Sequence, residues 1–219
     1  MDATGCVLAD LDGDRDLDLL VNSVGGGTRC WRNDGTGRFS EVTAEVGLGG
    51  RGGASSMALS DIDGDGDLDL YVVHYRTSTI RDEFQQRFEI KVIDGQPTVV
   101  AVNGRPATEP DLVGRFTVAA NGRITEHGEE DHLYRNEGAG RFVRVPFTGG
   151  TFLDEAGKPL GRPLYDWGLA AQFRDVNRDG APDLYVCNDL GSPDRLWLGD
   201  GQGRFRAIPR WAVRKTSWF

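Results

Sequence analysis

Three nine-residue windows with the same spacing of acidic residues constrain this chain more than any other feature. Each window has the form D-x-[DN]-x-D-x-x-x-D, and together the three hold 13 of the 24 aspartates. Carboxylates packed this closely repel one another unless a cation neutralises them. The windows are DLDGDRDLD at 10–18, DIDGDGDLD at 61–69 and DVNRDGAPD at 175–183. The pattern predicts three loops that bind a divalent cation.

Calcium is the cation that best suits these loops. It accepts 6–8 oxygen ligands in a flexible geometry, whereas magnesium prefers a tighter octahedron and keeps its waters. We expect positions 1, 3, 5 and 9 to supply side-chain oxygens and position 7 a backbone carbonyl. The predicted ligands are Asp10, Asp12, Asp14 and Asp18 with the carbonyl of Asp16; Asp61, Asp63, Asp65 and Asp69 with the carbonyl of Asp67; and Asp175, Asn177, Asp179 and Asp183 with the carbonyl of Ala181. The third set has one carboxylate fewer, so we expect weaker binding there.

Two alternatives compete with this interpretation. An EF-hand begins with the same letters but needs a bidentate Glu at its twelfth position, where this chain has Val21, Val72 and Val186. The flanking segments LDLLV and LDLYVV also have the period of strands rather than of helices. Three solvated acidic turns are the plainer alternative, because Asp and Gly favour turns. Three copies with matching flanks favour a repeated cation-binding loop.

A second motif follows each acidic window and marks a repeat. It is WRNDGTGRF at 31–39, YRNEGAGRF at 134–142 and WLGDGQGRF at 197–205, in each case a strand end, a tight glycine turn and a new strand. Four strands per repeat predict the blade of a β-propeller. The predicted fold is all-β, a partial propeller of about three four-stranded blades with a small β-rich insertion in the second. The predicted divisions are repeat 1 at 1–53, repeat 2 at 54–73 and 133–165, the insertion at 74–132, and a C-terminally incomplete repeat 3 at 166–219.

These two motifs resemble a known family. The D-x-D-G-D-x-D-L-D-L loops with N-x-G-x-G-x-F turns are similar to FG-GAP/VCBS repeats, over about 160 of the 219 residues. The resemblance implies a calcium-binding β-propeller like those of integrin α-chains and of many bacterial surface or secreted proteins. The similarity is greater to the bacterial VCBS-repeat proteins related to the UnbV and cartilage-acidic-protein group. The third loop departs from the pattern, with Asn177 in place of Asp and Arg178 in place of Gly.

The number of repeats indicates part of a larger ring, since propellers have about 4–8 blades. We therefore expect the rest of its own propeller as the principal partner, with closure by oligomerisation as the alternative. In that larger ring Trp211, Trp218 and Phe219 would pack against the next blade.

The insertion contains the three histidines and no recognised catalytic motif. Residues 76–88 predict one short helix, and residues 88–106 predict a β-hairpin around the turns IDGQP and VNGRP. The segment EHGEEDH at 126–132 could supply a zinc or acid–base site, with His74 nearby. It lacks H-E-x-x-H or a comparable spacing, so we expect a solvated turn.

Cysteines and recurring aromatic residues are predicted to be buried. Cys6, Cys30 and Cys187 show no motif spacing and are expected to act as small core residues, which leaves their redox state open. The aromatic residues at equivalent repeat positions are expected in cores or between blades. These are Trp31, Tyr134 and Trp197, and Phe39, Phe142 and Phe205, with Trp167 in the same class.

Composition limits the function. A net charge of −9 argues against nucleic acid and anionic membranes as partners, and no segment is apolar enough to span a membrane. The predicted function is a calcium-binding propeller region of an exported protein, extracellular, periplasmic or at the cell surface, that binds or adheres to a protein or carbohydrate ligand. The alternative is the scaffold of a carbohydrate-active enzyme whose site includes the insertion. A Glu or His of the insertion lining a pocket beside an Arg would favour that alternative.

Overall fold

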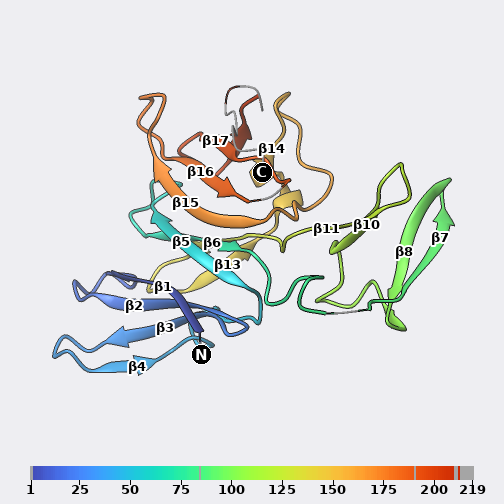
Figure 1. The fold of residues 1–219 in the computed structure, drawn as a ribbon. Helices are drawn as coiled ribbons and strands as arrows, with labels where there is room; N and C mark the ends of the chain where they lie inside the picture. The colour runs from blue at the N-terminus through green and yellow to red at the C-terminus, as the bar shows by residue number, and fades with distance from the viewer. Residues whose placement is uncertain (1, 84, 190, 210–211, 213–219) are drawn as a thin grey trace.

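The computed structural model describes residues 2–83, 85–189, 191–209 and 212, which form five β-sheets (Figure 1). The structure's one named helical element over these residues is a five-residue π-helical turn, η1 (Phe147–Thr151). The predicted all-β class is therefore confirmed. None of the helices in this part of the chain is long and apolar enough to cross a membrane.

The first sheet is an antiparallel meander in chain order. Its strands are β1 (Asp2–Ala9), β2 (Asp18–Val24), β3 (Gly27–Asn33) and β4 (Phe39–Glu41). The first acidic window connects β1 to β2, and the glycine turn of the second motif connects β3 to β4. Each acidic or glycine-rich segment thus ends one strand and begins the next.

The second sheet has the same order but is interrupted by the insertion. It consists of β5 (Ala54–Ser60), β6 (Asp69–His74), β12 (His132–Asn136) and β13 (Phe142–Val145). The chain leaves the sheet after His74 and returns at His132, which lies opposite Val72 in the β6–β12 ladder. The two ends of the insertion are therefore adjacent.

The third sheet repeats the meander and gains a fifth strand. Its strands are β15 (Gly168–Arg174), β16 (Asp183–Asn188), β17 (Arg195–Gly199) and β18 (Phe205–Ala207). The short strand β14 (Phe152–Leu153) pairs in parallel with β18 at its edge.

The insertion forms two small sheets that project away from the stacked sheets (Figure 1). Strands β7 (Phe88–Ile93), β8 (Gln96–Val102) and β9 (Arg105–Pro106) make one, which confirms the predicted hairpin; β10 (Phe116–Val118) and β11 (Ile124–Glu126) make the other. The prediction of a helix at 76–88 was wrong. Its described residues contain a turn in which the Asp82 carboxylate accepts hydrogen bonds from the Thr79 N–H and hydroxyl. The Asp82 N–H in turn donates to the Thr79 carbonyl at 2.9 Å, so the turn closes within four residues.

A β-bulge at one repeat position shows that the three sheets are copies of one unit. The first two strands of each sheet shift register between Ala3 and Gly5, between Ala54 and Ser56, and between Gly168 and Ala170. Counted back from the acidic windows, these positions are equivalent. The repetition therefore extends to backbone irregularities.

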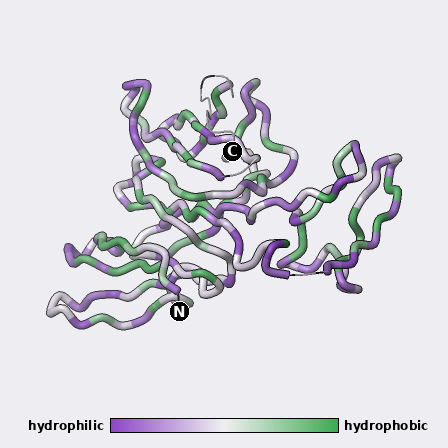
Figure 2. Tube along the Cα trace, viewed as in Figure 1, coloured by the Kyte–Doolittle hydropathy of each residue, from purple (hydrophilic) through white to green (hydrophobic). Residues whose placement is uncertain are grey.

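The sheets stack face to face around two cores. In the first core Leu20 and Cys30 of the first sheet meet Leu70, Val72 and Phe142 of the second. In the second core the other face of the second sheet meets the third sheet, around Leu133, Leu184, Trp197 and Phe205. Figure 2 shows hydrophobic residues along the stacked strands and hydrophilic residues in the loops that join β1 to β2 and β15 to β16.

One prediction about buried residues was wrong for the first sheet. Phe142 and Phe205 are 3% and 1% exposed, but the equivalent Phe39 is 43% exposed. Cys6 lies on the same face and is also exposed, whereas Cys30 is buried and Cys187 is intermediate. No described sheet covers this face, so residues that are core in the second and third sheets are open here. The predictions for Trp211, Trp218 and Phe219 lie outside the described residues.

Candidate metal centre

The three acidic windows occupy equivalent hairpin loops, on the side of the molecule away from the insertion (Figure 1). In each loop the first Asp accepts backbone N–H bonds from positions 4 and 6. Asp10 accepts from Gly13 and Arg15, at 2.8 and 3.0 Å, and Asp61 accepts from Gly64 and Gly66, at 2.7 and 3.0 Å. The first carboxylate therefore sets the curvature of the loop around itself.

Positions 4 and 6 need left-handed backbone, which explains the glycines there. Gly64 and Gly66 have φ of 79° and 95°, which glycine adopts without steric cost. In the third loop position 4 is Arg178 with φ of 66°, a conformation that costs an L-residue about 1–2 kcal/mol. Arg15, at position 6 of the first loop, has φ of 76°, so the first and the third loop each hold one arginine in this conformation.

The first two loops bring three carboxylates together. In Asp10, Asp12 and Asp14, one oxygen each lies within 4.8 Å of the others, and Asp61, Asp63 and Asp65 form the same group. Burial, followed by the charge of Asp65, raises the pKa of Asp63. Among the described residues the buried Oδ1 of Asp63 has no hydrogen-bond partner. A hard cation would satisfy this oxygen, so the donor set fits Ca²⁺.

Position 9 has a second role that the spacing did not reveal. Asp69 is fully buried, and its two oxygens accept the N–H groups of Ile62 (2.9 Å) and Asn136 (2.8 Å). Burial raises the pKa of Asp69 to about 6. The equivalent aspartates accept the same pair of backbone N–H bonds. Asp18 accepts from Leu11 and Asn33, and Asp183 accepts from Val176 and Gly199. Position 9 therefore joins the start of its loop to the third strand of its sheet.

Position 7 points its side chain away from the group of three. A Cβ on Gly35 would lie 2.7 Å from an oxygen of Asp16, so this carboxylate packs on the glycine turn of its own repeat. Asp67 and Ala181 take the equivalent place, beside Gly138 and Gly201. This placement leaves position 7 its backbone carbonyl as the group to offer an ion, as the spacing predicts.

An arginine accompanies the Asp at position 3. Arg32 Nε lies 3.1 Å from Asp12 Oδ2, and Arg135 Nε lies 3.0 Å from Asp63 Oδ2. In the third repeat both partners differ: position 3 is Asn177 and the arginine position is Leu198. The arginine and the carboxylate are thus present together or absent together. An alignment of WRN, YRN and WLG beside the three windows could have revealed this pair.

The third loop is closed by its own side chains. Asn177 Nδ2 donates to Asp179 Oδ2 at 2.7 Å, so a neutral amide neighbours the carboxylate of position 5. Residues 175–180 are all exposed. Although all nine residues of this loop are described, its Asp175, Asp179 and Asp183 are not among the groups able to hold a metal. The weaker binding expected for this loop stays a prediction.

Each of the first two loops contacts the following repeat. Asn136 Nδ2 of the second sheet donates to the Leu11 carbonyl at 2.9 Å, and Gly203 N–H of the third donates to the Ile62 carbonyl at 2.9 Å. Leu11 and Ile62 are position 2 of their loops and are almost fully buried. The conformation of each of these loops therefore determines whether it can make the hydrogen bond that links its sheet to the next one.

The segment at 126–132 is not the solvated turn that we predicted. Glu126 accepts a 2.8 Å bond from Arg115, and the side chains of both are about 5% exposed. Asp131 is 8% exposed, because β6 and β12 close over it. Among the described residues, the histidines join no group of three able to bind a metal.

A Tyr–Asp pair at the β6–β12 junction recurs in the third sheet. Asp131 accepts bonds from the Tyr71 hydroxyl (2.8 Å) and the His74 N–H (2.7 Å). Asp194 accepts the equivalent bonds from Tyr185 (3.1 Å) and the Asn188 N–H (2.8 Å). Burial of the imidazoles lowers the pKa of His74 to about 4 and of His132 to about 2, so both are neutral at pH 7. These side chains hold the sheet together where the insertion leaves it.

Asp131 should make stability depend on pH. Burial raises its pKa to about 7, against about 3.9 in the unfolded chain. Between these values the unfolded chain loses the proton first, so the contribution of Asp131 to stability is greatest below pH 4 and falls until pH 7. Relative to wild type, Asp131→Asn should gain on the order of 2 kcal/mol between pH 5 and 8, measured by urea unfolding. Asp194→Asn, with the same bonds around a less buried carboxylate, is the matched control. Parallel pH profiles for wild type and Asp131→Asn would contradict this assignment.

Comparison with known proteins agrees with the repeat. Residues 10–72 match the model of the FG-GAP-like repeat. Cartilage acidic protein 1 of Xenopus tropicalis is 27% identical over 183 residues, which cover 81% of this chain and 27% of that protein. The chain thus spans about a quarter of the length of this relative. Together with the three copies of the sheet and loop, these matches support an FG-GAP-like repeat in this chain and a similarity to cartilage acidic protein 1.

Proposed function

We propose that this chain is a calcium-stabilised part of a β-propeller from an exported protein, and that it serves as a binding or adhesion module. The observation that carries the proposal is the two groups of three carboxylates, each on a loop that contacts the next sheet. The three stacked meanders would be three blades. Exposed loops of this kind bind calcium where its concentration is millimolar, as it is outside the cytosol. This supports an extracytosolic site of action.

In this proposal the ions have a structural role. Asp10, Asp12 and Asp14, and Asp61, Asp63 and Asp65, would supply side-chain oxygens, with the carbonyls of Asp16 and Asp67. Bound calcium would neutralise the repulsion among the three carboxylates of a loop. It would thereby stabilise the loop conformation in which the residue at position 2 contacts the following blade. The carboxylates of these loops already accept backbone N–H bonds, which makes them poor proton carriers.

The alternative function, a carbohydrate-active enzyme, has one observation in its favour. Glu83 and Glu129 of the insertion line a pocket beside Arg76, Arg105 and Arg115. Burial opposes ionisation of Glu83, yet bonds from Ser78 and Gln86 hold its pKa below the usual range. Glu129 accepts the Gly53 N–H at 2.7 Å. Neither carboxylate is placed to exchange a proton freely, so we favour binding over catalysis.

Calcium titration of loop variants tests the proposal. Isothermal titration should detect two tighter sites, and Asp63→Ala should remove one of them. Asp179→Ala, in the loop with three carboxylates, should leave both tighter sites in place, because Asn177 already neighbours that carboxylate. Equal losses in the two variants would refute the ranking. Absence of calcium uptake at millimolar concentration would refute the proposed function.

A further inference from the structure

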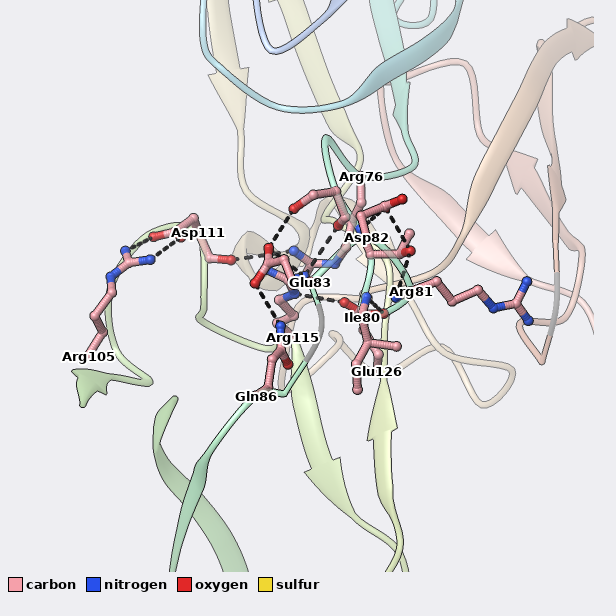
Figure 3. Close-up of polar contacts among 12 residues, drawn as sticks. Arg76, Ile80, Arg81, Asp82, Glu83, Gln86, Arg105, Asp111, Arg115 and Glu126 are labelled. Carbon is pink, nitrogen blue, oxygen red and sulfur yellow. Dashed lines mark hydrogen bonds and ion pairs between the residues drawn. The ribbon is translucent and has the colours of Figure 1, made fainter. Parts of the chain in front are cut away.

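The base of the insertion contains a polar pocket of about 100 Å³, which we call the insertion pocket. It lies where residues 76–83, residues 102–115 and Glu129 meet, near the ion pairs shown in Figure 3. Val102 and Leu112, 3% and 4% exposed, supply apolar surface to its lining. The volume is below the 300–1,000 Å³ typical of drug-sized ligands and suits a single small ring.

Two buried arginines face the insertion pocket with donors that lack short partners in the part of the chain that the structure describes. Arg76 donates its Nε and Nη2 to the carbonyls of His127 and Gly128, and its side chain is 4% exposed. Among the described residues the Nη1 of Arg76 has only long contacts, 3.4 Å to the Asp111 carbonyl and 3.9 Å to Glu129. In the same way Arg115 Nη2 lies 3.4 Å from the Ser78 carbonyl and 3.6 Å from Glu83 Oε1. A ligand oxygen could accept shorter bonds from both guanidinium groups.

The charges around the insertion pocket are already balanced. Each arginine has a carboxylate within 4 Å: Glu129 at 3.9 Å from Arg76, Glu126 at 2.8 Å from Arg115, and Asp111 at 2.7 Å from Arg105. Figure 3 shows the pair of Arg105 and Asp111, and Glu83 and Glu126 close to Arg115. Because a nearby carboxylate neutralises each arginine, an anion would gain little electrostatic free energy on leaving water for this pocket. A simple anion is therefore disfavoured as the ligand.

A ligand that both donates and accepts at neighbouring atoms would fit this lining. Vicinal hydroxyl groups have that property, since each hydroxyl offers one donor and two acceptor lone pairs. The C–H face of a sugar ring would pack on Val102 and Leu112. We propose that the insertion pocket binds one uncharged pyranose unit. The proposal deepens the binding function proposed above and rests on it, although the pocket shares no residue with the acidic loops.

Saturation-transfer NMR on the whole chain in calcium tests this proposal. The probes are the methyl pyranosides of glucose, galactose, mannose and N-acetylglucosamine, and methyl glucuronide. Drug-sized ligands gain about 0.3 kcal/mol of binding free energy per non-hydrogen atom, so a sugar of about 13 such atoms should bind with a Kd of about 1 mM. We expect at least one neutral pyranoside to bind in this range and to exceed methyl glucuronide at least tenfold. A free sugar and the terminal unit of a glycan share this chemistry, so an oligosaccharide of the same sugar is compared.

Two matched variants locate the binding. Thr77 is exposed at the lining, so Thr77→Trp should fill the insertion pocket and weaken the sugar at least tenfold. Thr125→Trp, an exposed threonine on β11, should leave the affinity unchanged. Binding that survives Thr77→Trp, a preference for the glucuronide, or no binding at 50 mM (about 50-fold above the expected Kd) would each overturn the proposal. Calcium titration of Thr77→Trp tests the proposed propeller function separately, because this substitution leaves the acidic loops unchanged.

Discussion

Removing calcium is expected to lower the melting temperature by about 10–20 °C. A ligand that binds only the folded state at 100 times its Kd stabilises by about 2.7 kcal/mol, so two such sites contribute about 5 kcal/mol. For a domain of this size each kcal/mol shifts Tm by roughly 2–4 °C. Thermal unfolding followed by circular dichroism, in 1 mM CaCl₂ (an assumed ~100-fold excess over Kd) and in excess EGTA, measures the shift.

A variant without the two tighter sites supplies the control. Asp14→Ala with Asp65→Ala removes one carboxylate from each group of three, and both residues are exposed. This double variant should melt at the same temperature with and without calcium, close to the wild type in EGTA. Magnesium at the same concentration should restore little of the loss, because it dehydrates reluctantly. Identical wild-type melting curves with and without calcium would show that the loops do not stabilise the fold through a metal.

Asp69→Ala is expected to be destabilising even without calcium, by about 2–4 kcal/mol. The substitution leaves the buried N–H groups of Ile62 and Asn136 without acceptors, and each unsatisfied group costs about 1–3 kcal/mol. Relief of the buried charge offsets part of this cost, since burial raises the pKa of Asp69 to about 6. Urea unfolding in EGTA measures the difference.

Asp65→Ala is the matched comparison in the same loop. Its carboxylate is exposed, so calcium-free stability should change by less than about 1 kcal/mol, whereas the gain from calcium should fall. Comparing the two variants distinguishes a carboxylate that stabilises the fold by accepting backbone N–H groups from one that acts as a calcium ligand. If the two variants lose equal stability in EGTA, position 9 has no structural role of its own.

These expectations follow from the position of the loops between sheets. Leu11 and Ile62 each follow the first Asp of a loop and each give a carbonyl to the next sheet. An ion that fixes the loop should therefore also stabilise the adjoining junction. The 175–183 loop differs in two ways, with Asn177 at position 3 and Leu198 where the other repeats have an arginine.

Much of the architecture could be predicted from local pattern. The spacing of aspartates predicted three hairpin loops, and the alternating flanks predicted the strands on either side of them. This succeeds because an Asx-rich turn and a period of two depend on residues close in the chain. The hairpin at 88–106 was predictable for the same reason, whereas the prediction of a helix at 76–88 failed, and the described residues there contain a turn between Thr79 and Asp82.

By itself the sequence predicted which side chains could act as metal ligands, the length of the repeat, and weaker binding by the third loop. Only the tertiary structure decided that the position-9 aspartates serve the backbone and that Asp131 is buried under Tyr71. It also decided that Phe39 is open while Phe142 and Phe205 are core, and that three insertion arginines meet in one pocket. The physical reason is that burial and pairing depend on which sheet or strand covers a residue. Those neighbours lie dozens of residues away, beyond the reach of any local pattern.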